Sequence, residues 1–285
     1  MSSASINPTV RRRRLGAELR RLREQKGMTA EDVAQQLLVS QSKISRLENG
    51  RRSISQRDVR DLCTVYGVTD EAMVEGLMTM ARESRQRGWW HAFGDLPYSV
   101  YIGLEQEAAK ILVYESLLLP GLLQTREYAQ ALVTGIQPDR DLEAVNRRVD
   151  VRMQRQERIH GEDPVDLWAV IDEAALQRTV GNPEIMRAQL EHLAQLGDMP
   201  HVNIQVLPFR SGAHPGMSGA FSILEFPESA DTAVVYLEGV TSDLYLEKEL
   251  DVRRYTGLYE HLRASALSTA ESKALIVDKA KEHSP

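Results

Sequence analysis

Apolar residues in the first 67 positions recur three and four places apart, which is the spacing of an α-helix with one buried face. This pattern predicts four short helices, over about 10–26, 30–37, 41–48 and 56–66. A hydroxyl residue stands just before each of the last three helices, where an N-cap accepts a hydrogen bond from the first turn: Thr29, Ser40 and Ser55. The sequence therefore predicts a small all-helical domain over residues 1–67.

The third of these helices has two different faces. Ile44 and Leu47 lie three positions apart and are expected to point inward, which leaves five polar residues outside: Gln41, Ser42, Lys43, Ser45 and Arg46. A helix exposed only to water gains nothing from short amide and hydroxyl groups at its start, but a helix in the major groove needs them to reach base edges. A tight turn joins it to the second helix, so the pair has the dimensions of a helix-turn-helix with a recognition helix at 41–48.

The polar residues of this module have expected parts in DNA binding. Gln41 can bond adenine through two hydrogen bonds, and Arg46 can reach guanine or a phosphate. Lys43, Arg51 and Arg52 are placed to neutralise backbone phosphates. The predicted DNA-binding set is Thr29, Ser40, Gln41, Ser42, Lys43, Arg46, Arg51 and Arg52.

Charge is divided unequally along the chain. Residues 1–66 carry 14 Lys or Arg and 7 Asp or Glu, a net charge of +7, whereas the remainder carries 21 cations and 34 acids, a net charge of −13. A basic module on an acidic body indicates a polyanionic partner at the N-terminal end. The run of four arginines at 11–14 fits such a partner and fits a solvated flank equally well.

Composition also bears on the compartment. The basic start of the sequence lacks the apolar segment of a secretion signal, and no later apolar run has the length of a membrane span, so a cytoplasmic protein without a membrane partner is expected. The single cysteine, Cys63, excludes an intramolecular disulfide and a zinc site with several thiolates.

The pattern changes after residue 67. Residues 68–87 are predicted to form a helical linker, and residues 88–285 alternate between helical and strand-like segments. The apolar, β-branched segments at 201–209, 220–226 and 233–239 are expected to be neighbouring strands of an antiparallel sheet. The predicted fold is thus multidomain, with an all-α helix-turn-helix domain followed by a larger α+β domain that regulates, dimerises and binds a partner.

Two aromatic residues open the larger domain. Trp89 and Trp90 lie in a segment with glycines and a proline, which indicates an ordered loop. Their indole rings are interpreted as packing anchors, with ligand stacking as the alternative.

A Gly-rich loop at 211–220, with His214 inside it, is the strongest candidate for chemistry. The loop lacks the Gly-x-Ser-x-Gly spacing of a nucleophile elbow and the Gly-Lys-Ser/Thr ending of a phosphate loop. His201 has no thiolate or second histidine nearby, and Asp172 and Glu173 are more simply the N-cap and first-turn acid of a helix. We therefore expect no catalytic site, metal or cofactor, and interpret the loop as a ligand or partner surface or as a mobile hairpin.

A row of arginines marks one predicted helix of the larger domain. Its members are Arg147, Arg148, Arg152, Arg155 and Arg158, with Val145, Val149 and Met153 on the inward face. Such a row can receive an acidic partner, for which Arg152 and Arg155 are the candidates, or it can balance an acidic domain through internal ion pairs.

The residues of the N-terminal module resemble a known family. The stretch MTAEDVAQQLLVSQSKISRLENGRR at 28–52 is similar to the lambda-repressor-like helix-turn-helix of the xenobiotic-response-element class. The resemblance implies that Glu48 pairs with Arg23 of the first helix and so supports the recognition helix. Ala30 departs from the family pattern, in which a glutamine that binds phosphate is common.

The rest of the chain also carries a resemblance. Segments such as LPGLLQTREYAQALV and QLEHLAQLGDMPHVNIQVLPF resemble, over most of 88–277, an uncharacterised actinomycete domain found in WhiJ-like, toxin–antitoxin-like transcriptional regulators. That family implies regulation of development or antibiotic production and a small acidic partner protein.

The sequence thus predicts a dimeric, non-enzymatic transcriptional regulator that binds double-stranded DNA. The alternative is an antitoxin-like interaction protein that holds a small acidic partner and regulates only its own genes. An enzyme tethered to DNA is a third interpretation, and it would depend on His214 or Asp172.

Overall fold

The computed structural model describes residues 8–50, 52–85, 88–93, 98–137, 141–227 and 233–283. The chain divides into two compact units, residues 1–107 and residues 108–285. This division falls later in the chain than the predicted boundary between residues 87 and 88. Each unit is described by itself below.

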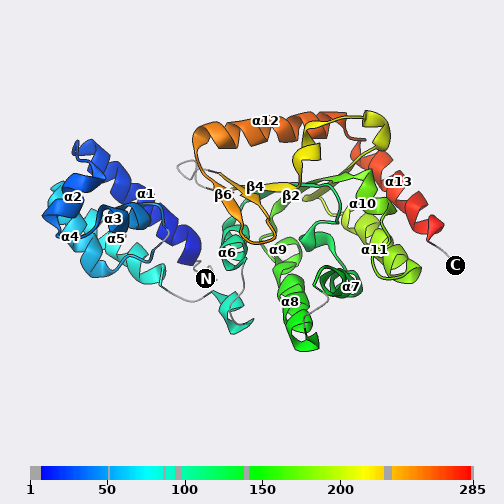
Figure 1. The fold of residues 1–285 in the computed structure, drawn as a ribbon, viewed down its shortest axis with the longest axis horizontal. Helices are drawn as coiled ribbons and strands as arrows, with labels where there is room; N and C mark the ends of the chain where they lie inside the picture. Colours follow the sequence, from blue (N-terminus) through cyan, green and yellow to red (C-terminus); the bar gives the residue numbers. More distant parts are fainter. Residues whose placement is uncertain are drawn as a thin grey trace. The chain divides into compact units, whose positions relative to one another are not determined.

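The first unit is entirely helical (Figure 1). Its helices are α1 (Pro8–Gln25), α2 (Ala30–Gln36), α3 (Gln41–Glu48), α4 (Gln56–Tyr66), α5 (Glu71–Glu83) and α6 (Ser99–Glu107), with a 3-10 helix η1 (Trp89–Phe93) before α6. The four helices predicted from the apolar spacing are therefore present.

Short polar residues start the helices as the sequence predicts. Thr29 and Ser55 each form a capping box, with Asp32 and Asp58 as the reciprocal acids, and Ser40 accepts a hydrogen bond from the backbone N–H of Lys43. Two reciprocal hydrogen bonds satisfy backbone donors that a helix start would otherwise leave unpaired. These local bonds fix where α2, α3 and α4 begin.

One apolar core joins all of the first five helices. It includes the predicted residues Leu15, Leu19, Ile44 and Leu47, which are at most 2% exposed. Helix α5 belongs to the same core through its buried residues Leu77 and Ala81. The segment predicted as a linker at 68–87 therefore contains a helix that completes the first unit.

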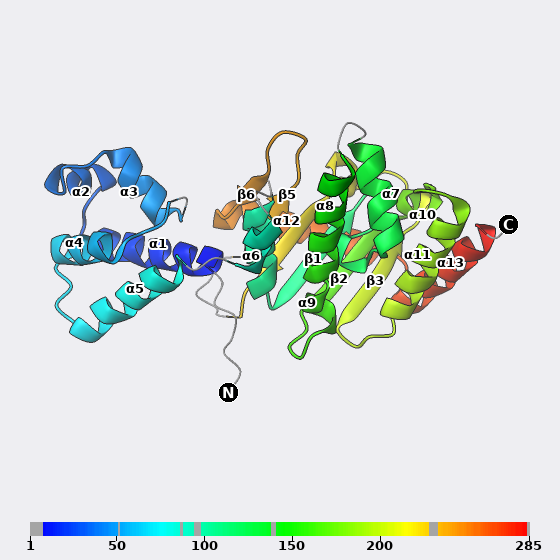
Figure 2. The ribbon, with the colours of Figure 1, turned by 90° about the horizontal axis from the view of Figure 1, so that it is seen from below.

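The second unit is built on a six-stranded mixed sheet, in the order β3-β2-β1-β4-β5-β6 (Figure 2). The strands are β1 (Lys110–Glu115), β2 (Asp166–Asp172), β3 (Val202–Leu207), β4 (Phe221–Glu225), β5 (Val234–Leu237) and β6 (Leu244–Leu246). Strands β1, β2 and β3 are parallel, whereas β4 pairs antiparallel with β1 and β5, and β5 pairs antiparallel with β6. The predicted fold class, an all-α domain followed by a larger α+β domain, is confirmed.

The prediction of three neighbouring antiparallel strands is correct only for β4 and β5. Strand β3 lies at the far edge of the sheet and runs parallel to β2. The physical reason is the length of the connections: α7 (Arg126–Ile136), α8 (Leu142–Arg155) and α9 (Glu157–His160) lie between β1 and β2, and α10 (Glu173–Gln177) and α11 (Pro183–Leu196) lie between β2 and β3. Helical crossovers of this length allow parallel pairing, which a hairpin cannot.

Helices cover both faces of this sheet. Helix α12 (Glu249–Ser265) lies on one face, where Tyr259 and Leu262 pack against Leu112 and Tyr114 of β1, and Figure 1 shows α7, α8 and α9 on the other side. The hydroxyl of Tyr259 donates to the carbonyl of Trp168 (2.9 Å). The sheet core is thus buried from both sides.

At Val206, the outer edge of β3 is bonded to the end of the connection that follows α12 and to the first turn of α13 (Thr269–Glu282). The backbone N–H of Val206 donates to Ser272 Oγ (2.9 Å), and the N–H of Leu267 donates to the carbonyl of Val206 (2.9 Å). These bonds satisfy edge groups that would otherwise be open to another strand.

A single residue is strained in the turn between α2 and α3. Leu38 has a φ of 55° and is, within the described ranges, the one non-glycine residue with a positive φ. Leu38 is also 93% exposed, so side-chain packing does not offset the conformational strain. A leucine in the left-handed region costs about 1–2 kcal/mol relative to its ordinary conformation.

We expect Leu38→Gly to stabilise the first unit by about 0.5–1 kcal/mol, because glycine adopts a positive φ freely but loses more chain entropy on folding. Native-state hydrogen exchange of amides in α2 and α3 measures this change for the first unit alone. Leu38→Ala, which removes the exposed side chain but keeps the Cβ atom, is the matched control and should change little. Equal stabilisation by both variants would contradict the strain argument.

Candidate nucleic-acid interface

The outer face of α3 is an exposed polar ridge. Ser42 lies three and four positions before Ser45 and Arg46, Asn49 lies four and three positions after them, and all four residues are exposed. The inner face consists of Ile44, Leu47 and Glu48, of which the first two are 1% and 2% exposed. The helix is therefore fixed by one side and open on the other.

The predicted binding residues fall into two groups. Gln41, Ser42, Arg46 and Arg52 have exposed side chains, as the prediction requires. Thr29 and Ser40 are exposed too, but their hydroxyl groups are engaged in the capping of α2 and α3. Arg51 lies outside the described residues.

Lys43 does not point freely into solvent. Its Nζ atom lies 2.9 Å from Oδ1 of Asp58 on α4, and the two side chains are 28% and 25% exposed. Lys43 was predicted to neutralise a backbone phosphate, and within the domain its charge is paired with that of Asp58.

The predicted binding set does not include Ser45, which was expected on the outer face, or Asn49, which was interpreted as part of the helix stop. Asn49 Nδ2 donates to Ser45 Oγ (3.3 Å) on the exposed ridge. Their positions three and seven residues after Ser42 place them on its face of a helix, so the periodicity contained the signal. Both carry short polar groups of the kind that reach base edges.

A bidentate ion pair between Arg23 and Glu48 holds α3 against α1. Arg23 Nε lies 2.7 Å from Glu48 Oε1, and Nη2 lies 3.0 Å from Oε2. The third nitrogen, Nη1, donates to the carbonyl of Met28 (2.7 Å) at the entry to α2. The support that the family resemblance implied for the recognition helix is therefore present in this chain.

The arginine run at 11–14 takes part in the same support. Arg12 Nε donates to the carbonyl of Gly50 (2.7 Å), just beyond the C-terminal end of α3, and Arg11 forms an ion pair with Glu83 of α5. A cation at a helix C-terminus interacts favourably with the helix dipole. Arg11 and Arg12 thus bind other parts of the first unit. The sequence had suggested only that the run binds a polyanion or forms a solvated flank.

Close backbone packing completes the junction of α1 and α3. A Cβ atom at Gly16 would lie 2.5 Å from the carbonyl oxygen of Glu48 and 2.6 Å from that of Leu47. Only a residue without a side chain allows this approach. Helix α3 is thus fixed at its C-terminal end by its inner side, while the polar residues along its outer face stay exposed.

The Gly-rich loop at 211–220 is held at the carboxyl edge of the parallel strands. His214 Nε2 lies 3.3 Å from Asp172 Oδ2 at the end of β2, and the hydroxyl of Tyr114 lies 3.5 Å from the same oxygen. Oδ1 of Asp172 accepts the N–H of Ala174 and so caps α10, as predicted (2.9 Å). A Cβ atom at Gly216 would lie 2.4 Å from the Tyr114 ring, so the loop lies directly on that side chain.

The arginine row on α8 and α9 does not form the exposed surface that binding an acidic partner requires. Arg155 is 9% exposed, Arg152 Nη1 donates to Gln124 Oε1 (2.9 Å), and Arg158 donates to the carbonyls of Asp163 and Ala108 (3.0 and 2.7 Å). Helix α8 is packed on more than one side, with Val145 and Val149 against α7 and Val151 also buried. The guanidinium groups of Arg152 and Arg158 therefore join segments of the second unit to one another, whereas the half-exposed Arg147 pairs with Glu143 of its own helix.

Glu115, at the end of β1, is a charged residue that the sequence analysis did not single out. Burial raises the pKa of this carboxyl to about 8, and the negative charge of Glu238 adds to the rise while Arg152 opposes it. Its position after a run of apolar strand residues gave no sign of a polar neighbourhood, because Glu238 and Arg152 come from distant parts of the sequence.

The remaining candidate residues have structural roles. Trp90 is 3% exposed, and its ring meets that of Trp89 edge to face with centroids 5.9 Å apart. Trp89 Nε1 donates to Gln106 Oε1 (3.4 Å), and His201 Nε2 lies 2.9 Å from the carbonyl of Ile159. The two indole rings are thus packed against each other, and one of them is hydrogen-bonded to α6.

The described ranges contain no group of three or more His, Cys, Asp or Glu side chains that could hold a metal ion. None of the helices described is both long and apolar enough to cross a membrane.

The geometry of the first unit defines a helix-turn-helix protein, and residues 14–76 match a family described as a helix-turn-helix domain. This match indicates a DNA-binding regulator. Residues 98–278, more than half of the chain, match a domain of unknown function, DUF5753, and the chain belongs to that family. No curated protein and no solved structure matches the chain.

We expect Arg23→Ala to destabilise the first unit by about 3 kcal/mol, because it leaves the nearly buried carboxylate of Glu48 without a partner. Urea titration combined with hydrogen exchange of α3 amides measures the loss. Arg20→Ala is the matched control: it breaks an exposed pair with Glu24 (2.8 Å) and should cost no more than about 0.5 kcal/mol. Similar losses from both variants would argue against a supporting role for Arg23.

Glu115→Gln should change how stability depends on pH. The folded-state pKa of Glu115 lies above its unfolded value, so the wild-type chain loses stability as pH rises from about 4.5 to about 8, where the unfolded carboxyl has released its proton and the folded one has not. Glutamine has no proton to release, so the variant does not lose stability in this way. The difference in free energy of unfolding, variant minus wild type, should therefore grow across that pH window and level off above it. Urea denaturation at several pH values tests this, and a constant difference between the two proteins would contradict it.

Proposed function

We propose that this chain is a sequence-specific transcriptional regulator of the lambda-repressor-like class, which reads an operator half-site with α3 and acts as a dimer. The observation that carries the proposal is the exposed ridge of Ser42, Ser45, Arg46 and Asn49 on a helix whose inner face is buried and tied to α1. A firmly positioned helix with short polar groups on its outer face is what major-groove reading requires.

The side chains of α3 suit both kinds of contact that such a protein makes. Gln41 begins the helix and can bond adenine N6 and N7 together, while Ser42, Ser45 and Asn49 offer shorter donors and acceptors. Arg46 can reach guanine or a phosphate, and Arg52 beyond the helix is an exposed cation suited to the DNA backbone. Base contacts of the first kind give specificity, and phosphate contacts give affinity.

The α+β unit is proposed to bring two chains together and to receive a small partner protein or ligand. Two-fold symmetry would then place two half-sites about one helical turn, roughly 34 Å, apart. An effector bound to this unit can change operator affinity only if it binds two states of the protein differently. Resemblance to actinomycete regulators supplies the expected setting, the control of development or antibiotic production.

Gln41→Ala should weaken binding to the operator by about 1–3 kcal/mol and leave binding to random duplex nearly unchanged, because a base contact is lost. Arg52→Ala should weaken both and reduce the slope of log K against log salt concentration by about 0.9. Polarisation titrations with operator and random duplexes at several salt concentrations measure both effects, after genomic mapping of bound sites has identified the operator.

Gln25→Ala provides the control, since that exposed glutamine ends α1 outside the predicted binding set. Equal effects of the Gln41 and Arg52 substitutions on both duplexes would contradict the division of roles. Failure of the wild-type chain to bind any duplex at low salt would overturn the proposed function itself.

A further inference from the structure

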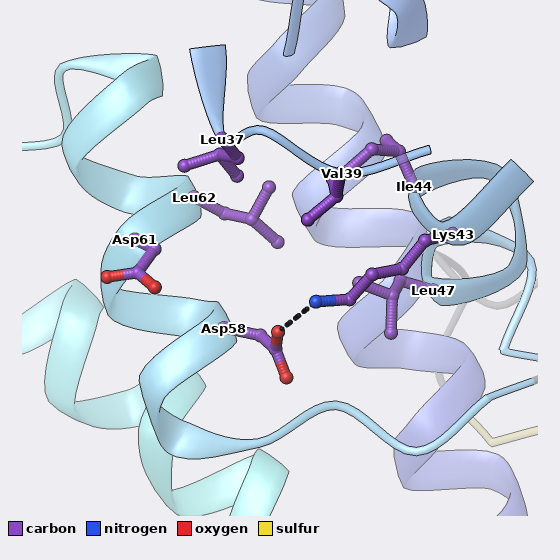
Figure 3. A pocket seen from close by; sticks show the side chains of 8 residues that line it. All are labelled: Leu37, Val39, Lys43, Ile44, Leu47, Asp58, Asp61 and Leu62. Carbon is purple, nitrogen blue, oxygen red and sulfur yellow. Dashed lines mark hydrogen bonds and ion pairs between the residues drawn. The ribbon is translucent and has the colours of Figure 1, made fainter. Parts of the chain in front are cut away.

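The recognition helix carries a cation that the fold has already neutralised. Lys43 reaches across from α3 to α4, and Figure 3 shows its ammonium group and the Asp58 carboxylate directed at each other. The distance between Nζ and Oδ1 is 2.9 Å, within the range of a charge-assisted hydrogen bond. Neither side chain is more than 28% exposed, so water screens this pair less than a pair on the open surface.

Local structure fixes both partners of this ion pair. Asp58 is the reciprocal acid of the α4 capping box: its Oδ2 accepts from the N–H and the hydroxyl of Ser55 (3.0 and 2.5 Å), which leaves Oδ1 for Lys43. Burial raises the pKa of Asp58, but the hydrogen bonds from Ser55 and Lys43 outweigh it and the net pKa is lowered. The carboxylate is thus held in place and charged near neutral pH.

The pair borders a small cavity behind α3. A space of about 50 Å³ lies between the turn after α2, helix α3 and helix α4, and it is lined by Leu37, Val39, Lys43, Ile44, Leu47, Asp58, Asp61 and Leu62 (Figure 3). The aliphatic stem of Lys43 lies along these mostly apolar side chains, as long cationic residues commonly do. Packing of the stem and pairing of the head therefore favour the same conformation.

Two other cations of the interface differ from Lys43. Within the part of the chain that the structure describes, the exposed side chains of Arg46 and Arg52 contact no acid. A cation that replaces a condensed counterion on DNA strengthens binding without regard to sequence and steepens its salt dependence. A cation that stays on a carboxylate of its own protein does neither.

From these contacts we infer that Asp58 withholds Lys43 from the DNA backbone and so limits sequence-independent binding by the recognition helix. The inference rests on the proposed function, because it concerns the same interface. It assigns Asp58 the role of a specificity-determining residue that touches no nucleotide: base contacts by α3 are unchanged while one phosphate contact is suppressed. The ratio of operator affinity to random-duplex affinity is raised as a result.

The test is the salt dependence of binding by the full-length chain to a random-sequence duplex. Asp58→Asn keeps the shape of the side chain but removes its charge, and should steepen the slope of log K against log salt concentration by about 0.9 and tighten binding about tenfold near 50 mM salt. Asp61→Asn is the matched control: it removes an acid from the same helix, and Asp61 pairs only loosely with Arg57, at 3.8 Å. The control should leave the slope within about 0.3 of wild type.

Lys43→Met keeps the test decisive if Asp58→Asn fails to fold. In the wild-type background this substitution should leave the slope nearly unchanged, and in the Asp58→Asn background it should abolish the gain. A slope reduced by about 0.9 in Lys43→Met alone would show that Lys43 leaves Asp58 on DNA and would overturn the inference. So would an Asp58→Asn protein that folds and keeps the wild-type slope. Absence of duplex binding by the wild-type chain would instead refute the proposed function.

Discussion

The contact between Arg23 and Glu48 is the constraint on which the N-terminal unit depends. It joins α1 to the inner face of α3, and the same guanidinium group holds the backbone at Met28, where the chain enters α2. Removal of one member of a nearly buried pair is costly, whereas the intact pair defines a single orientation of the helices. Arg12 on the Gly50 carbonyl and the bare backbone of Gly16 act at the same junction. These contacts fix the orientation of α3, so that its inner face stays buried and its outer face is exposed to solvent.

Charge in this unit does more than attract a polyanion. The net charge of the first 66 residues is strongly positive, but several of its cations have internal partners: Arg11, Arg12, Arg23 and Lys43 bind Glu83, a carbonyl, Glu48 and Asp58. A count of basic residues therefore overstates the charge that faces DNA. Among the described residues on and just beyond α3, the exposed cations are Arg46 and Arg52.

Local features of the fold, such as helix starts, could be predicted from the sequence. Contacts between residues far apart in the chain could not. Thr29, Ser40 and Ser55 mark helix starts because each cap depends on the next three residues. The partner of Lys43 could not be predicted, because Asp58 becomes its neighbour only when α3 and α4 pack together. Likewise β3 was recognised as a strand from its apolar pattern, but its place beside β2 depends on crossover helices rather than on its own residues. The arginines of α8 left two interpretations open, a partner surface and internal pairing, because helical spacing does not indicate whether a second face is also covered.

The two edges of the sheet are unlike each other. Val206 of β3 is bonded by Ser272 and Leu267, whereas β6 at the opposite edge pairs, within the described residues, with β5 alone. Backbone groups of an edge strand that have no partner can pair with a further strand. The bonds at Val206 therefore leave fewer such groups on β3, and a strand from another chain meets less competition along β6.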